Sequence, residues 1–166
     1  ALIALVVVGG ATRVMEAGLA CPDWPLCFGS FLPGNQMNVQ VFLEWFHRLD
    51  AFLVGIALFL QFVFSLVWRP YLPLWLTWSY GFLVFMVVFQ GLLGGLTVVN
   101  LLPTTVVTGH LAVALLLVAG MSGLTQLLLQ PDGFDSPFWW KCFGGTSLVA
   151  VIAQCLLGGY MATTWS

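Results

Sequence analysis

The chain has 166 residues, of which 61% are hydrophobic and only 6% are charged, whereas about 25% of residues are charged in a typical soluble domain. This composition argues against a water-soluble globular protein and against disorder, and the four scattered Lys and Arg residues make no phosphate-binding patch for nucleic acid. The apolar runs are long and unbroken, unlike the short alternating segments of a transmembrane β-barrel. The sequence therefore predicts an all-α polytopic membrane protein.

A membrane-spanning helix needs about 20 residues, and the charged residues divide the chain into five apolar segments. The first segment, about 1–17, opens within an apolar run and without Met, which we interpret as a fragment or a processed chain. A signal peptide is the alternative, but it requires basic residues before the apolar run, and Arg13 follows it. The other segments are expected at about 41–68, 73–99, 104–129 and 140–166.

Short connections favour antiparallel neighbouring helices. We therefore expect an antiparallel four-helix transmembrane bundle over residues 1–130, with a fifth helix, 140–166, that begins a second, truncated repeat. Residues 131–139 are predicted to form a cytoplasmic loop. The connection at 18–40 is the only long one, and long ordered loops often carry function.

Two signals place this long connection on the outer side of the membrane. Arg69 and Lys141 flank the second and fourth connections, and basic residues favour the cytoplasmic side, although Arg13 argues the other way. Cys21 and Cys27 lie six residues apart in the long connection, as a disulfide or as two unpaired thiols. We favour the disulfide, because exposed thiols outside the cell tend to oxidise.

Three similar Gly-Gly motifs recur along the chain, in VVVGGAT, GLLGGLT and CLLGGYMAT. Gly91 and Gly95 also form a G-x-x-x-G pair, which allows helix backbones to approach closely. The simpler interpretation of all three motifs is helix packing. The alternative is a duplicated bundle whose second copy begins in the fifth segment.

The chain has two histidines, His47 and His110, and each lies about six residues after the expected start of its segment. Both are therefore expected about 9 Å below the outer membrane face. The second and fourth segments run in the same direction, so the two imidazoles can clamp a haem between them. A hydrogen bond from each imidazole to a neighbouring helix is the alternative. We favour iron ligation, because ionisable groups at this depth usually face the interior.

Charged residues accompany the first histidine. Glu44 lies three residues before His47 on the same helix face, where it can relay protons at a reacting site or pair with Arg48 at i,i+4. Arg48 and Arg13 both approach the outer face, where a guanidinium can bind haem propionates or extend to the membrane interface. A carboxylate di-iron site is excluded, because the segments lack a second Glu-x-x-His and two further acids.

Four motifs together resemble the amino-terminal half of haem A synthase, a membrane enzyme of cytochrome oxidase assembly, over most of residues 8–120. They are GGATRVMEAGLACPDWPLCFGSFLP, EWFHRLDA, QGLLGGLT and LPTTVVTGHLAVALLL. The resemblance implies eight helices in two pseudo-symmetric halves. It also implies oxidation of the C8 methyl of haem O to a formyl group, by successive hydroxylations and loss of water.

The resemblance also implies roles for individual residues. By motif, His47 and His110 match the iron ligands of the substrate haem O, and Glu44 matches a functionally important carboxylate. Cys21 and Cys27 match the cysteines of the external loop. A haem b cofactor is implied in the second half of the family's fold.

The leading hypothesis is therefore a fragment of haem A synthase, a membrane haem-modifying oxidoreductase of the bacterial plasma membrane or the mitochondrial inner membrane. The candidate partners are haem O, the lipid bilayer, haem O synthase, a thiol-disulfide partner, an electron acceptor and a second copy of the chain. A bis-histidine b-type cytochrome that only transfers electrons is the alternative hypothesis. A structural or transport bundle without haem is a third.

Overall fold

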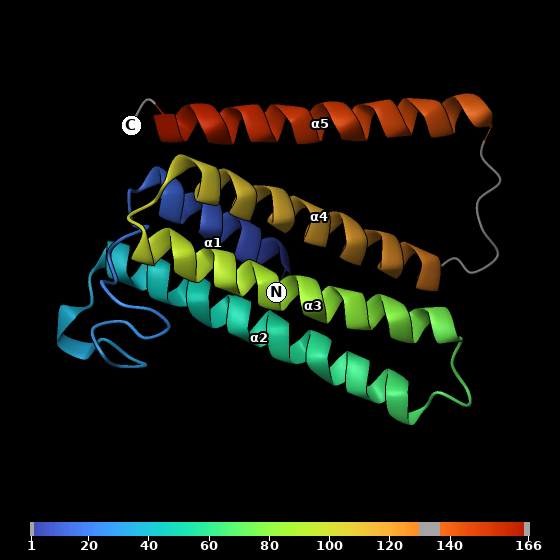
Figure 1. Cartoon of the computed structure of the whole chain (residues 1–166), viewed down its shortest axis with the longest axis horizontal. Coiled ribbons are helices and arrows are strands. Elements are labelled where there is room, and N and C mark those ends of the chain that lie inside the picture. The colour runs from blue at the N-terminus through green and yellow to red at the C-terminus, as the bar shows by residue number, and fades with distance from the viewer. Residues whose placement is uncertain (1, 130–136, 165–166) are drawn as a thin grey trace. The chain divides into compact units, whose positions relative to one another are not determined.

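The computed structural model of the protein describes residues 2–129 and 137–164, and these ranges contain five α-helices. The helices are α1 (Leu2–Val14), α2 (Val39–Val67), α3 (Leu74–Val99), α4 (Thr104–Leu129) and α5 (Phe138–Thr164), with a short 3-10 helix η1 at Gly34–Gln36 (Figure 1). No β-strand occurs within these ranges, so the all-α prediction is confirmed. Residues 130–136, most of the predicted cytoplasmic loop, lie outside the described residues.

The first helix ends three residues before the predicted boundary at residue 17. Glu16 has a φ of 53°, in the left-handed region, and the amide of Ala17 donates a hydrogen bond to the carbonyl of Thr12 at 2.8 Å. This turn satisfies a carbonyl at the end of α1 and turns the chain out of the helix.

The second helix begins at Val39, two residues before the predicted start. The side chain of Asn38 caps this end, because it accepts a hydrogen bond from the amide of Val41 at 3.0 Å. His47 consequently lies eight residues after the first residue of α2, or about 12 Å along the axis, whereas His110 lies six residues into α4, or about 9 Å. The expected spacing of six residues holds for His110 and is wrong for His47.

Four helices, α2 to α5, are long and apolar enough to cross a membrane by length and composition, and α1 is a shorter apolar helix. Many of their large apolar side chains are exposed. Examples are Phe52, Phe59, Phe82 and Phe85. Lipid tails solvate such side chains as well as a protein interior does, so outward-facing aromatic residues are expected on membrane helices. The chain is therefore an integral membrane protein.

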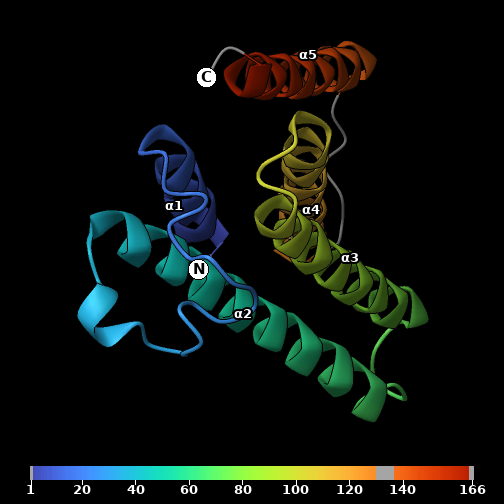
Figure 2. The same cartoon turned by 60° about the vertical axis from the view of Figure 1, so that its left-hand side comes forward.

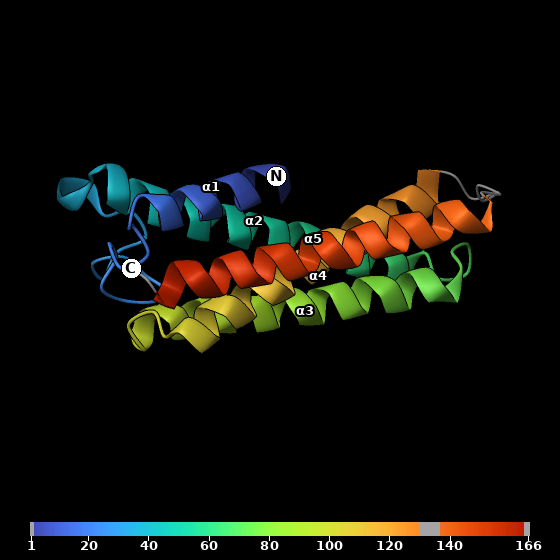
Figure 3. The ribbon, with the colours of Figure 1, turned by 90° about the horizontal axis from the view of Figure 1, so that it is seen from above.

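The chain divides into two compact units, residues 1–103 and residues 104–166. In the first unit, α1 packs against α2 and α2 packs against α3, as Figures 1 and 2 show. In the second unit, α4 and α5 pack together and run in opposite directions (Figure 3). The predicted boundary between a first bundle and a truncated repeat, near residue 130, stays a prediction.

Small residues and one polar contact join α2 to α3. The ring of Phe62 lies over Gly81, where an added Cβ atom would stand 3.2 Å from a ring carbon. The hydroxyl of Thr77 donates to the carbonyl of Ser65 across the helix interface at 3.4 Å. Leu58 is buried on α2 between these contacts and the loop end of the helix. These contacts hold α2 and α3 together beside the loop that precedes α2.

Candidate functional site

A disulfide between Cys21 and Cys27 closes the loop between α1 and α2, with Cα atoms 4.8 Å apart. Both half-cystines are almost completely buried, and they form a small apolar cluster with Val41 of α2. Ala20 and Trp45 pack against this cluster. The predicted disulfide is therefore confirmed, and it anchors the loop to the first turn of α2.

Asp23 holds the tip of this loop. Its carboxylate accepts hydrogen bonds from the backbone amides of Phe28 and Gly29, at 2.6 and 2.7 Å. Both of these residues have φ in the left-handed region, at 54° and 69°. Such a conformation costs glycine little and Phe more, so the two bonds to Asp23 stabilise a turn that the backbone alone disfavours.

The loop also contacts α3 through Trp24. Its indole ring lies over Gly95 of the motif GLLGGLT, where an added Cβ atom would be 3.0 to 3.2 Å from three ring atoms. Around Gly91, one turn earlier, no described heavy atom lies within 4 Å of the corresponding position. The interpretation of this pair as a site of helix–helix approach is therefore wrong for Gly95, which instead receives the ring of a loop residue.

The N-terminal part of α2 presents Glu44 and Arg48 beneath the loop. Glu44 is only 4% exposed, and its Oε2 accepts a hydrogen bond from the amide of Cys21 at 2.8 Å. Its Oε1 forms an ion pair with the guanidinium of Arg48. Arg48 Nη1 also donates to the carbonyl of Asp23 at 2.7 Å and to the carbonyl of Leu26. The two side chains together fasten the loop backbone to α2.

Some of these contacts could be predicted from the sequence, and others could not. The spacing of Glu44 and Arg48 allowed the ion pair, and that pair is present. The contact between Glu44 and Cys21 joins residues 23 positions apart, and no local pattern signals it. Arg13, the other predicted propionate contact, lies in the last turn of α1. The proton-relay role of Glu44 and the propionate contacts of Arg13 and Arg48 stay predictions.

His47 lies one turn further along α2, and its imidazole packs against α1. An added Cβ atom at Gly9 would stand 2.8 Å from Cε1 of the ring, so glycine at this position makes room for the imidazole. Nδ1 is buried and makes no hydrogen bond within residues 2–129 and 137–164, while the backbone of Leu5 and the carboxylate of Asp50 interact with the ring. Such an imidazole fits a metal ligand, because the ring can bind a metal through Nε2 while Nδ1 takes an outer partner.

Asp50 belongs to the same cluster, and the sequence analysis did not assign it a role. It follows His47 by three residues, on the same face of α2, and it is 8% exposed. Its Oδ2 is buried and has no hydrogen-bond partner in the described part of the chain. The sequence could have pointed to Asp50, because a carboxylate at the start of a long apolar segment is rare and usually has a function.

The second predicted ligand, His110, is half-buried in the second turn of α4, in the other unit. The next residue, Leu111, packs on Gly159 of α5, where an added Cβ atom would stand 2.6 Å from Cδ2 of the leucine. The third Gly-Gly motif therefore does serve helix packing, as the simpler interpretation expected. The pairing of His47 with His110 on one iron stays a prediction.

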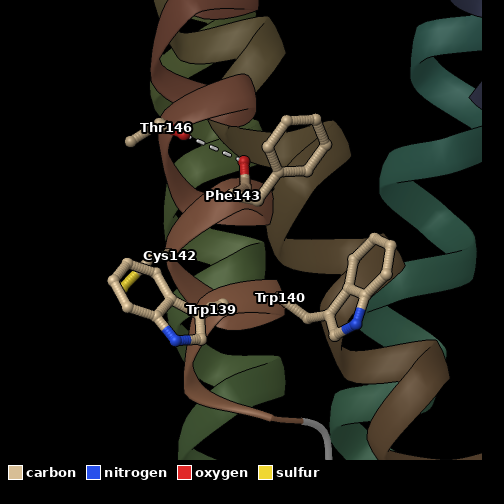
Figure 4. Close-up of a pocket in the computed structure, with 5 residues that line it drawn as sticks. All are labelled: Trp139, Trp140, Cys142, Phe143 and Thr146. Atoms are coloured by element: carbon tan, nitrogen blue, oxygen red, sulfur yellow. Dashed lines mark hydrogen bonds between the residues drawn. The ribbon is translucent and has the colours of Figure 1, made fainter.

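A shallow apolar depression lies on α5 and is drawn in Figure 4. It is lined by Trp139, Trp140, Cys142, Phe143 and Thr146. The only hydroxyl there donates to the carbonyl of Phe143 at 3.0 Å, within the helix itself. No charged side chain is among these five residues, and the thiol of Cys142 is the one ionisable group that they contribute.

A conventional protein metal site is also missing from the described residues, because they contain no group of three or more His, Cys, Asp and Glu that could hold an ion. Haem iron is different, because the macrocycle supplies most of the ligands and the protein adds one or two.

The fold and the site define a class: a polytopic helical membrane protein with a disulfide-closed loop above a buried carboxylate and a half-buried histidine. The chain belongs to the cytochrome oxidase assembly protein family, which it matches over residues 1–165. The family that the motifs resemble is therefore confirmed.

Curated relatives give the same result. The chain is similar to the haem A synthase of Bradyrhizobium diazoefficiens, at 31% identity over 98% of this chain and 54% of the relative. It is similar to those of Shewanella oneidensis (29%, covering 98% and 54%) and Shouchella clausii (33%, covering 90% and 51%). The chain thus spans about half the length of the curated relatives it matches. No solved structure matches it.

Proposed function

We propose that this chain is the amino-terminal part of a haem A synthase, a membrane oxidoreductase that converts the C8 methyl of haem O to a formyl group. The observation that carries the proposal is the imidazole of His47, set against Gly9 beneath a disulfide-closed loop in a chain of the cytochrome oxidase assembly protein family. A cytochrome that only transfers electrons needs such a histidine too, but the family and the names of the relatives favour the enzyme.

In this proposal the polar end of α2 faces the substrate. His47 and His110 ligate the iron of haem O, and Glu44 accepts or returns protons near the reacting methyl. Arg13 and Arg48 contact the propionates. The hydrogen bond from Cys21 and the ion pair with Arg48 support the role of Glu44, because they fix its carboxylate one helical turn from His47.

We further propose that the disulfide loop faces the outer side of a bacterial plasma membrane or a mitochondrial inner membrane. The disulfide supports this side, because such bonds persist in oxidising compartments. Arg69 and Lys141, at the opposite ends of the spans, favour the cytoplasmic side or its equivalent. The whole protein would carry haem b in its second half. It would work with haem O synthase, a thiol-disulfide partner, an electron acceptor and a second copy of itself.

The test is pigment analysis of the full-length protein expressed with a source of haem O. Extracted haems are separated by mass into haem B, haem O and haem A. Haem A is expected with the wild type and should be lost with His47→Ala. Gly10→Ala is the matched control, because no described heavy atom lies near the added methyl, and it should retain haem A. Unmodified haem alone from the wild type would favour the electron-transfer cytochrome instead.

The role of Glu44 needs a gentler substitution. Glu44→Gln keeps an oxygen that can accept the hydrogen bond from Cys21, but it removes the proton-accepting carboxylate. We expect a folded protein with little haem A. Undiminished haem A in the Glu44→Gln extract would remove Glu44 from the chemistry and leave it as an anchor of the loop.

A further inference from the structure

Two buried polar atoms on one face of α2 have no hydrogen-bond partner among the residues described: Nδ1 of His47 and Oδ2 of Asp50. Leaving a buried donor or acceptor unsatisfied costs about 1–3 kcal/mol for each group, and more for a charged group. Folded proteins rarely keep such groups without a use. The two atoms therefore call for a common explanation.

The two side chains are near neighbours. Residues three apart on a helix lie on the same face, about 5–6 Å apart at Cβ, and the carboxylate of Asp50 interacts electrostatically with the imidazole of His47. Gly9 of α1 limits the ring from the other side, because the space for a Cβ atom there is already filled by the imidazole. The ring is therefore confined between α1 and the face of α2 that carries Asp50.

The other acid on this face, three residues before His47, is already occupied. Both oxygens of Glu44 are bonded, one to the amide of Cys21 and the other to Arg48. Asp50 is thus the carboxylate that remains available to His47 in the described chain. Its competitor as an acceptor is the backbone of Leu5 on α1, which also interacts with the ring.

A carboxylate beside a metal-ligating histidine has a known physical effect. When one ring nitrogen donates its hydrogen to a carboxylate, the tautomer and the orientation of the ring are fixed, and the other nitrogen becomes a stronger donor to the metal. The stronger donor stabilises the oxidised metal and lowers its reduction potential.

We propose that Asp50 is a positioning residue for His47: its carboxylate accepts the hydrogen of Nδ1 through one buried water, and so commits Nε2 to the haem iron. This inference rests on the proposed function, in which His47 ligates haem. It assigns a role to Asp50, to which the resemblance gave none. Asp50 acts on the ligand and not on the reacting methyl.

The experiment uses the purified full-length protein. The difference between the absorption spectra of the wild type and of His47→Ala defines the haem held by His47. The reduction potential of that haem and its rate of transfer to excess apomyoglobin are then measured in Asp50→Asn. We expect a higher potential and haem loss about 10- to 100-fold faster, the range seen when an outer carboxylate partner is removed from a metal ligand. Asp50→Glu should restore part of both.

Ser65→Ala is the matched control. Ser65 is also buried on α2, but its hydroxyl donates to Phe62, about 27 Å along the helix from His47, so this variant should leave the potential and the transfer rate unchanged. If Asp50→Asn does not accumulate, Asp50→Ser gives the same comparison with a smaller neutral side chain.

The outcomes separate the two proposals. Identical spectra for the wild type and His47→Ala would show that His47 holds no haem, which overturns the haem site and the role of Asp50 together. A spectral difference, with Asp50→Asn behaving like Ser65→Ala, would overturn the role of Asp50 alone. The backbone of Leu5 would then be the partner of the ring.

Discussion

The loop end of α2, residues 39–50, and its remainder, residues 51–67, differ in what they contact. The loop end carries an ion pair, a bond to the disulfide loop and a histidine set against α1. The remainder has no charged residue and meets α3 through glycine, aromatic and aliphatic contacts and one hydroxyl bond. Lipid replaces lost apolar contacts at little cost, but nothing in an apolar environment replaces a lost polar partner. Single substitutions should therefore act strongly at the loop end and weakly in the remainder.

The largest effect is expected from Glu44→Ala. It leaves the guanidinium of Arg48 half-buried without its ion-pair partner and the amide of Cys21 without an acceptor. Breaking a buried pair from one side costs about 3 kcal/mol or more. Thermal unfolding in detergent and faster reduction of the Cys21–Cys27 bond by a thiol reagent would both report the loss. Glu44→Gln should cost about 1 kcal/mol, since it retains the bond to Cys21. Equal stability of the two variants would contradict this account.

A second, smaller effect is expected from Gly9→Ala. The added methyl would stand 2.8 Å from the ring of His47, so the imidazole or the helix must shift, at about 2 kcal/mol. Gly10→Ala adds the same methyl next to it with no described atom within 4 Å, and alanine favours a helix over glycine by about 1 kcal/mol. The melting temperatures of the pair should therefore move in opposite directions, and only Gly9→Ala should change the haem spectrum. A Gly9→Ala protein as stable as Gly10→Ala would mean that the ring is free to move.

Gly95→Ala tests the contact between the loop and α3. The methyl would press on the indole of Trp24. Because Trp24 belongs to a loop it can move outward, so we expect the free energy of unfolding to fall by only about 1 kcal/mol. Limited proteolysis in the loop should become faster. Gly91→Ala, one turn earlier, is the control and should leave the cleavage rate unchanged. Faster cleavage in both variants would point to a general effect on α3.

The smallest effect belongs to the apolar remainder of α2. Thr77→Val removes the hydroxyl that reaches the carbonyl of Ser65 across the helix interface, and such bonds in membranes contribute about 0.6 kcal/mol. Ser79→Ala removes a hydroxyl bonded within its own helix to Trp75 and serves as the control. Unfolding in a series of mixed detergents would measure the difference in stability between Thr77→Val and Ser79→Ala. A loss as large as that of Glu44→Ala would remove the contrast between the two ends of α2.

Some features of the site were accessible from sequence because they depend on local spacing. The i,i+4 distance predicted the pair of Glu44 and Arg48, and two cysteines in one loop predicted the disulfide. The predicted helix boundaries lie within three residues of the observed ones because charged residues interrupt the apolar runs. The simpler interpretation of the Gly-Gly motifs as packing sites held for Gly159, but the sequence did not show which group each glycine receives: an imidazole, an indole or a leucine.

The sequence by itself determined that this chain is helical, membrane-embedded and built around a few charged residues, because an apolar segment about 20 residues long has one low-energy state in lipid. Only the tertiary structure decided which groups those charges meet. It brought Cys21 onto Glu44, Gly9 onto His47 and Trp24 onto Gly95. These partners are distant along the chain, and the packing of helix faces against each other decides which of them meet. The periodicity of the sequence describes the faces of each helix but not which faces come together.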